Sequence, residues 1–371
     1  MTFTKCTFLM TLFGVVSYVT DTGIDISVAF QHYTKGHFIA GSLTLICILL
    51  AMIVVQIFSY FWFKEELQEG LHETTNWIVL THLFQFGIFL RYFLVVRDGY
   101  KAVFRPQSKG MDHPDKIICA VADLTMLRLF ETFLESIPQL ILQIYFLMKY
   151  ENISLLQYAF LVACLCSTAW STVDFQISLR KALPDKKEIR VGPSMLTFLC
   201  YKIFTLTSWT LSIALFCLQN IFFLLLLVVV LWILSFMWTW KQGTSFCRST
   251  RMEVLYRIIV GVILVFTFFN VRGYKTKIPI FVYYVFRVFM TGSILSLCWY
   301  WDPSVTKKDF FLPVSVTIVM TLGLGILSLI LYYGVFHPNL YKVQEKCTDV
   351  PDGPITPSED RSNRMQNFLM L

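Results

Sequence analysis

Ionisable side chains interrupt a segment that is otherwise apolar enough for a bilayer, DLTMLRLFETFLESIPQLILQIY at positions 123–145. At a helical period four of its polar side chains share one stripe: Arg128, Glu131, Glu135 and Gln139. A charge at the centre of a bilayer costs at least about 2.5 kcal/mol. The stripe must therefore face protein or water, and it indicates where a membrane protein handles something polar.

Other ionisable residues lie within or beside further apolar segments. Asp21 and Asp25 are one helical turn apart, together with Ser17, so one face of the first apolar segment is polar. The remaining candidates are the acids Asp123 and Asp174 and the bases Arg91, Arg128, Lys202, Arg257 and Arg287. These residues predict either ion pairs that fix the register of neighbouring helices or a polar track that lipid headgroups or ions use.

The composition is that of a membrane protein. Of the 371 residues, 56% are hydrophobic and only 15% are charged, which excludes an ordinary soluble protein of this size. Apolar runs of about 20 residues recur along most of the chain and predict an all-α, polytopic membrane protein. The formal net charge of +7 lies mainly in loops, so it concerns topology and not binding to nucleic acid.

The distribution of Lys and Arg predicts which apolar segments cross the membrane. About ten segments can be drawn, but if all of them crossed, the basic loops 97–116 and 180–190 would lie outside. The conflict disappears if the weakly apolar third segment, 77–93, dips into the membrane and returns. The eighth segment, 254–269, is a similar candidate because basic loops lie on both sides of it.

The resulting order of two spans, one re-entrant segment and two spans occurs twice. We therefore expect about eight spanning helices plus two re-entrant segments in two parallel repeats, 1–190 and 191–336. Both termini would then be cytosolic. The re-entrant segments should lie in the interior, because irregular backbone at membrane depth needs protein or water around it.

Residues 337–371 differ in composition and predict a flexible, cytosolic regulatory tail. An executioner caspase requires Asp at the cleaved position, prefers another Asp three residues earlier and tolerates a small residue just after. Asp349, Asp352 and Gly353 fit that pattern. Cleavage after Asp352 would release the apolar tip that we expect to act as a plug: Phe368, Leu369, Met370 and Leu371.

Motifs for catalysis or metal binding do not occur in a suitable context. The sequence has no GxSxG, HExxH, P-loop or GxGxxG motif where its chemistry would need it. Its ten Cys form neither a CxxC pair nor a Cys/His cluster, so no metal site or disulfide framework is expected. We expect no enzymatic activity and no cofactor.

Three strings resemble the XK-related family of membrane proteins: LRLFETFLESIPQLILQIY, WSTVDFQISLRKALPDKK and FHPN. The similarity runs along nearly the whole chain, and the short length and the tail motif resemble the caspase-activated members. The resemblance implies a phospholipid scramblase of the plasma membrane that exposes phosphatidylserine in apoptosis, without ATP, after its C-terminal tail is cleaved. Such exposure marks apoptotic cells for engulfment.

The resemblance also implies partners and sites. Phosphatidylserine, phosphatidylcholine and phosphatidylethanolamine would be the lipids, an executioner caspase the activator, and a single-span accessory protein a further partner. Cleavage would follow Asp352, with Asp349 as the distal recognition acid. The intramembrane acids of the family would correspond to Asp21, Asp25, Asp123, Glu131, Glu135 and Asp174.

Two other functions fit the residues themselves. Acids within helices and a repeated topology also suit an ion- or proton-coupled transporter that works by alternating access. A non-transporting scaffold for a single-span partner would use the same acids only to hold its helices together.

Overall fold

The computed structural model describes residues 4–68, 77–104, 114–150, 155–183, 189, 192–270, 277–301 and 306–337. Within these ranges the regular structure is helical, which confirms the expected all-α, polytopic class. The elements are α1 (Lys5–Thr34), α2 (Phe38–Gln68), α3 (Trp77–Leu83), α4 (Gly87–Phe104), α5 (Pro114–Glu131), η1 (Thr132–Ser136), α6 (Ile137–Tyr150), α7 (Leu155–Ala182), α8 (Pro193–Gln219), α9 (Ile221–Gln242), α10 (Thr250–Phe266), α11 (Lys277–Trp301), α13 (Phe311–Leu331) and η2 (Tyr332–Phe336).

Among the described helices, seven are long and apolar enough to cross a bilayer: α1, α2, α7, α8, α9, α11 and α13 with η2. An eighth helix runs continuously from Pro114 to Tyr150 through α5, η1 and α6. Its length is about 55 Å, well beyond the ~30 Å thickness of the hydrocarbon. Its ionisable residues set it apart from the apolar spans, and it carries the polar stripe noted in the sequence.

The helix α5–η1–α6 lies in the core of the bundle. Met126, Phe130, Phe133 and Ile137 are fully buried along it. The π-helical turn η1 ends two residues before Pro138, which has no N–H to donate to the preceding turn. A wider turn accommodates that loss without ending the helix.

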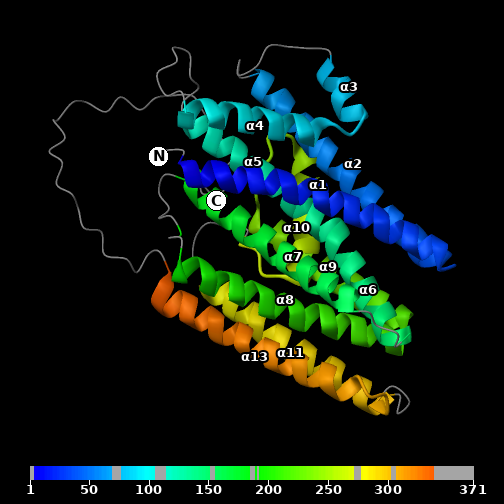
Figure 1. The fold of residues 1–371 in the computed structure, drawn as a ribbon. Helices are drawn as coiled ribbons and strands as arrows, with labels where there is room; N and C mark the ends of the chain where they lie inside the picture. Colours follow the sequence, from blue (N-terminus) through cyan, green and yellow to red (C-terminus); the bar gives the residue numbers. More distant parts are fainter. Residues whose placement is uncertain are drawn as a thin grey trace.

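Helix α8 connects the two sides of the molecule. It packs against α6 and α7 on one side and against α11 and α13 on the other, as Figure 1 shows. Within the most apolar stretch of each helix, 67% of α8 is buried inside the protein, but only 11% of α9 and 11% of α13. The apolar residues of α9 and α13 therefore form part of the lipid-facing surface, because little protein covers them.

The chain bends by 119° between α3 and α4, a geometry that fits a re-entrant segment and also a broken span. The turn places Gln85 at a positive φ of 65°. One side chain of α2 satisfies the backbone there: Gln56 Nε2 donates to the carbonyl of Gln85 at 2.9 Å, and Gln56 Oε1 accepts from the N–H of Gly87 at 3.1 Å. Backbone groups at membrane depth need such partners because no water reaches them.

A second set of contacts ties the same segment to α2. The buried Arg91 donates through Nε to Ser59 Oγ at 3.0 Å and also pairs with Glu66 at 3.3 Å. His82 Nδ1 donates to the carbonyl of Ile78 at 2.8 Å, because a carbonyl can only accept. Nε2 of the neutral ring therefore accepts from the Ser59 hydroxyl, 3.0 Å away. Arg91 and His82 therefore act as structural ties in the first half.

Helix α10 occupies the corresponding place in the second half. It is short, most of its side chains are buried, and the chain leaves the helix in an extended conformation at Thr267. The described elements of both halves therefore follow the order of two helices, a short or bent segment and two helices. The boundaries of the two repeats, 1–190 and 191–336, stay a prediction.

The packing of the turn between α3 and α4 against Gln56 and His82 can be tested at Gly87. A Cβ added at Gly87 would overlap the side chains of His82 and Gln56. We expect Gly87→Ala to lower the stability by about 1–3 kcal/mol, because the crowded site cannot take the methyl group without shifting. Thermal unfolding of the detergent-purified protein measures this effect.

Gly292→Ala is the matched control, since the surroundings of Gly292 in α11 hold no heavy atom within 4 Å of an added Cβ. It should leave the melting temperature unchanged or raise it, because Ala favours helix over Gly. Equal melting temperatures for the two variants would contradict the tight packing of Gly87 against His82 and Gln56.

Candidate functional site

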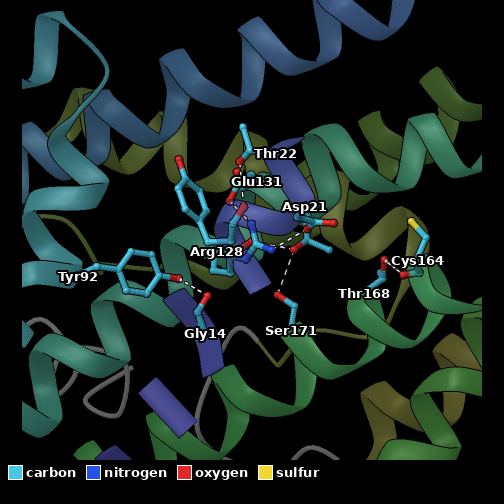
Figure 2. A network of polar contacts seen from close by, with 11 residues as sticks. Gly14, Asp21, Thr22, Tyr92, Arg128, Glu131, Cys164, Thr168 and Ser171 are labelled. Carbon is cyan, nitrogen blue, oxygen red and sulfur yellow. Dashed lines mark hydrogen bonds and ion pairs between the residues drawn. The ribbon is translucent and has the colours of Figure 1, made fainter. Parts of the chain in front are cut away.

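Arg128 is the centre of an ion network that joins α1 to α5. Its Nη2 donates to Asp21 Oδ2 at 2.6 Å, and its Nη1 donates to Glu131 Oε2 at 2.7 Å (Figure 2). The side chains of all three residues are less than one fifth exposed. A guanidinium can bond two carboxylates at once because its donors are fixed in a planar fork.

Contacts from other helices surround this network. The Arg128 guanidinium lies 5.2 Å from the centre of the Tyr18 ring, which attracts a cation through its π face. The Thr132 hydroxyl lies 3.1 Å from Ser171 of α7, and Tyr92 of α4 donates to the carbonyl of Gly14 at 3.4 Å. As Figure 2 shows, these contacts bring α1, α4, α5 and α7 to one place.

A groove of about 940 Å³ opens beside the network, between α1, α6 and α7. Asp21 and Asp25 lie on its α1 side, and Gln139 and Gln143 on its α6 side. Its apolar lining residues Phe13, Val16 and Val19 are more than half exposed. The groove therefore has a polar floor and an apolar rim. We call it the polar groove.

A second, smaller cavity of about 50 Å³ continues the polar groove toward the start of α1. Thr7, Arg128, Asp174 and Lys181 are among its lining residues. The two spaces share the lining residues Phe13, Ser17 and Ser167. Together they follow α1 from Thr7 to Lys35, a helical rise of about 40 Å, which exceeds the ~30 Å of hydrocarbon. We call the combined space the α1 track.

The structure brings together most of the acids that the sequence singles out. Asp21 and Asp25 line the polar groove, Asp174 lines the smaller cavity, and Glu131 bonds Arg128. Glu135, on η1, is buried and lies beside Asp25. Asp123 is also buried, but it does not line either of these two spaces.

The cationic candidates of the second half lie elsewhere and hold the ends of α10. Lys202 donates to Thr267 Oγ1 at 2.9 Å and to the carbonyl of Phe268 at 3.0 Å. Arg287 donates to the carbonyl of Val265 at 3.0 Å and stacks on the Trp209 ring at 4.0 Å. Cations suit this place, because the carbonyls at a helix C-terminus carry partial negative charge.

Arg257 has a similar role at the start of α10. It pairs with Glu253 at 3.4 Å and donates to Thr244 in the preceding loop. Glu253 in turn accepts from the N–H of Cys247 at 2.7 Å. Arg257, like Lys202 and Arg287, therefore positions α10 and does not line the α1 track.

Several residues of the α1 track were not singled out from the sequence. Gln143 continues the stripe of Glu135 and Gln139 by one more turn, so the same helical spacing would have found it. His32 and His37 lie at the other end of the polar groove, where both rings approach Phe146 at 5.1 Å. No pattern in the sequence indicates that these two imidazoles meet a ring of α6.

The predicted cleavage site and plug lie outside the described residues. This concerns Asp349, Asp352 and Gly353 as well as Phe368, Leu369, Met370 and Leu371. Within the described ranges, no group of three His, Cys, Asp or Glu side chains could hold a metal ion. The arrangement that remains is two adjoining spaces beside α1, with acids, one guanidinium and amides among their lining residues.

The ion network predicts a large loss of stability when Arg128 is removed. In Arg128→Gln, Asp21 and Glu131 lose their common cation, and breaking such a buried pair costs about 3–5 kcal/mol. The double variant Arg128→Gln with Asp21→Asn should recover part of the melting temperature, because it removes one of the uncompensated acids. Thermal unfolding measures both.

The exposed pair of Arg97 and Asp98 offers the control, at 2.7 Å but with 43% of the Arg97 side chain exposed. Arg97→Gln should cost at most about 1 kcal/mol. Additive effects of Arg128→Gln and Asp21→Asn would show that the two side chains do not interact.

The sequence is similar to that of known proteins of one family. The family model described as XK-related protein matches residues 9–338. XK-related protein 9 of Tetraodon nigroviridis is 33% identical, with 99% of each chain covered. XK-related protein 8 of the same species is 31% identical, with 93% of this chain and 87% of the relative covered. XK-related protein 8 of Gasterosteus aculeatus is also 31% identical, with 94% and 89% covered. The chain therefore belongs to the XK-related family.

Proposed function

We propose that this protein is a phospholipid scramblase of the plasma membrane. The α1 track is the observation that carries this proposal, because it extends a polar floor over a distance comparable to the bilayer while its rim stays apolar. The resemblance of the sequence to caspase-activated scramblases of the XK-related family supports the same function. Phosphatidylserine exposure in apoptotic cells is the proposed outcome.

The physical task of a scramblase is to carry a polar headgroup across about 30 Å of hydrocarbon while the acyl chains stay in lipid. A groove that is polar at its floor and apolar at its rim meets both requirements at once. Phosphate can interact with Arg128 or Lys181, and ammonium groups with Asp21 or Asp25. The movement needs no ATP, because lipids only equilibrate between the leaflets.

In this proposal the C-terminal tail regulates lipid movement. The tail, 337–371, lies in the cytosol with both termini, and its apolar tip at Phe368–Leu371 occupies a pocket of the bundle until a caspase cleaves after Asp352. Cleavage turns a tethered plug into a free peptide, so the high local concentration that kept it bound is lost. The activating partner is an executioner caspase.

Narrowing the α1 track should slow lipid movement. Ser167 of α7 lines both of its spaces, so Ser167→Phe fills the passage between them. We expect the caspase-cleaved variant to move lipids roughly tenfold more slowly, which corresponds to a barrier raised by about 1.4 kcal/mol. Fluorescent lipids and dithionite quenching in liposomes measure the rate.

Cys166→Phe is the matched control, because Cys166 is the preceding residue on α7 and is exposed. This variant should scramble at the rate of the unchanged protein. Equal rates for Ser167→Phe and Cys166→Phe, with both proteins folded, would argue against the α1 track as the route.

The tail generates a separate prediction. In liposomes, the intact protein should move lipids slowly, the caspase-cleaved protein quickly, and the Asp352→Ala protein slowly with or without caspase. The reason is that Asp352→Ala removes the acid that the protease requires. Equally fast movement by intact and cleaved protein would contradict regulation by the tail and leave the route untouched.

A further inference from the structure

In the part of the chain that the structure describes, three buried polar atoms of η1 and α6 have no hydrogen-bond partner and lie beside the polar groove. They are the amide oxygen and nitrogen of Gln139 and Oε2 of Glu135. Gln139 and Glu135 are each only 2% exposed and lie one helical turn apart. Unpaired polar atoms at this depth cost free energy, which a polar ligand in the groove would recover. Gln139 lines the groove, so such a ligand can reach it.

Two of the four acids at this place also have no compensating cation within the described residues. Arg128 compensates Asp21 and Glu131 through direct bonds. Asp25 and Glu135 are both buried and lie beside each other, and neither bonds a cation in the part of the chain that the structure describes. Two adjacent carboxyl groups at membrane depth need a proton or a cation between them.

Of the cations that a bilayer supplies, a primary ammonium group fits this site best. It carries a positive charge and three N–H donors, and the site offers carboxylate oxygens and the amide oxygen of Gln139 as acceptors. A trimethylammonium group carries the same charge but has no N–H to donate. Metal ions are a poorer match, since the described residues hold no suitable group of three ligands.

We propose that Asp25 and Gln139, which line the polar groove, bind the primary ammonium of an aminophospholipid, such as phosphatidylethanolamine or phosphatidylserine, on its way along the groove, and that the Glu135 carboxyl beside Asp25 supports this binding. This inference rests on the proposed function. The Gln139 amide oxygen accepts from the ammonium group, and the amide nitrogen donates to a phosphate oxygen of the same headgroup. The acyl chains leave over the apolar rim formed by Phe13, Val16 and Val19. Choline lipids pass as well, but they bind more weakly here.

Competition between two lipids tests the proposal without requiring transport. The full-length protein in detergent receives equal concentrations of dioctanoyl phosphatidylethanolamine and dioctanoyl phosphatidylcholine, and native mass spectrometry compares the amounts bound. We expect a preference of about tenfold for the ethanolamine lipid, since hydrogen bonds between charged partners add that much affinity. Glu135→Gln and Gln139→Leu should bring the ratio close to one.

Gln143→Leu is the matched control. Gln143 lines the same groove one turn further along α6, but it is only partly buried and is not among the residues with buried unpaired atoms. Its variant should keep the preference. Melting temperatures show whether each variant is folded. If Gln139→Leu does not fold, Glu135→Gln still tests the proposal, because Gln has the same shape as Glu.

Three outcomes of this competition would overturn the proposal: equal binding of the two lipids by the unchanged protein, an unchanged preference in both Glu135→Gln and Gln139→Leu, or a preference lost equally in Gln143→Leu.

Soluble phosphoethanolamine, added in a separate arm, distinguishes a free amine from a lipid. Binding of phosphoethanolamine without binding of the ethanolamine lipid would also overturn it. An absence of scrambling would defeat the proposed function, whereas the lipid preference would still support this site.

Discussion

Charge compensation inside the membrane is the constraint on which this structure depends. Four acids of α1, α5 and η1 lie in one small region at membrane depth: Asp21, Asp25, Glu131 and Glu135. One guanidinium, Arg128, bonds two of them and thereby fixes α1 against α5. Asp21 and Asp25 line the polar groove and Arg128 lines the smaller cavity, whereas Glu131 and Glu135 lie behind them. The opposite face of α5 and η1 is buried among aromatic and aliphatic side chains.

The same constraint explains how short segments turn within the bundle. At the first turn the amide of Gln56 satisfies one carbonyl and one N–H of the bend, and Arg91 ties the segment to α2. At the end of α10, Lys202 and Arg287 donate to the freed carbonyls. In both cases a side chain from a neighbouring helix replaces the water that would solvate such a turn in a soluble protein.

Helical spacing predicted much of this arrangement. The stripe of Arg128, Glu131 and Glu135 was visible because residues three and four apart share one face of a helix. The ion pair between Arg128 and Asp21 could not be predicted from the sequence, since 107 positions separate the two residues and tertiary packing alone brings them together. The charge distribution also predicted a re-entrant segment at 77–93. The chain bends by 119° there, between α3 and α4, and whether the segment crosses the membrane stays a prediction.

The roles of Lys202 and Arg287 could not be predicted in the same way. A sequence shows the cation but not the unpaired carbonyls at the end of another helix, so an ion pair looked as reasonable as the contacts that the structure has. The meeting of His32 and His37 with Phe146 depends in the same way on how the turn after α1 packs on α6.

The claim that matters most is that headgroups and water enter the α1 track while the membrane around it stays dry. Labelling by a water-soluble thiol reagent in liposomes tests it directly, comparing Ser17→Cys inside the track with Val19→Cys on its exposed apolar rim. Labelling of the unchanged protein is subtracted, because it has cysteines of its own. Faster labelling at position 17 than at position 19 is the result that this account predicts. No labelling at position 17 in the caspase-cleaved, folded protein would contradict it.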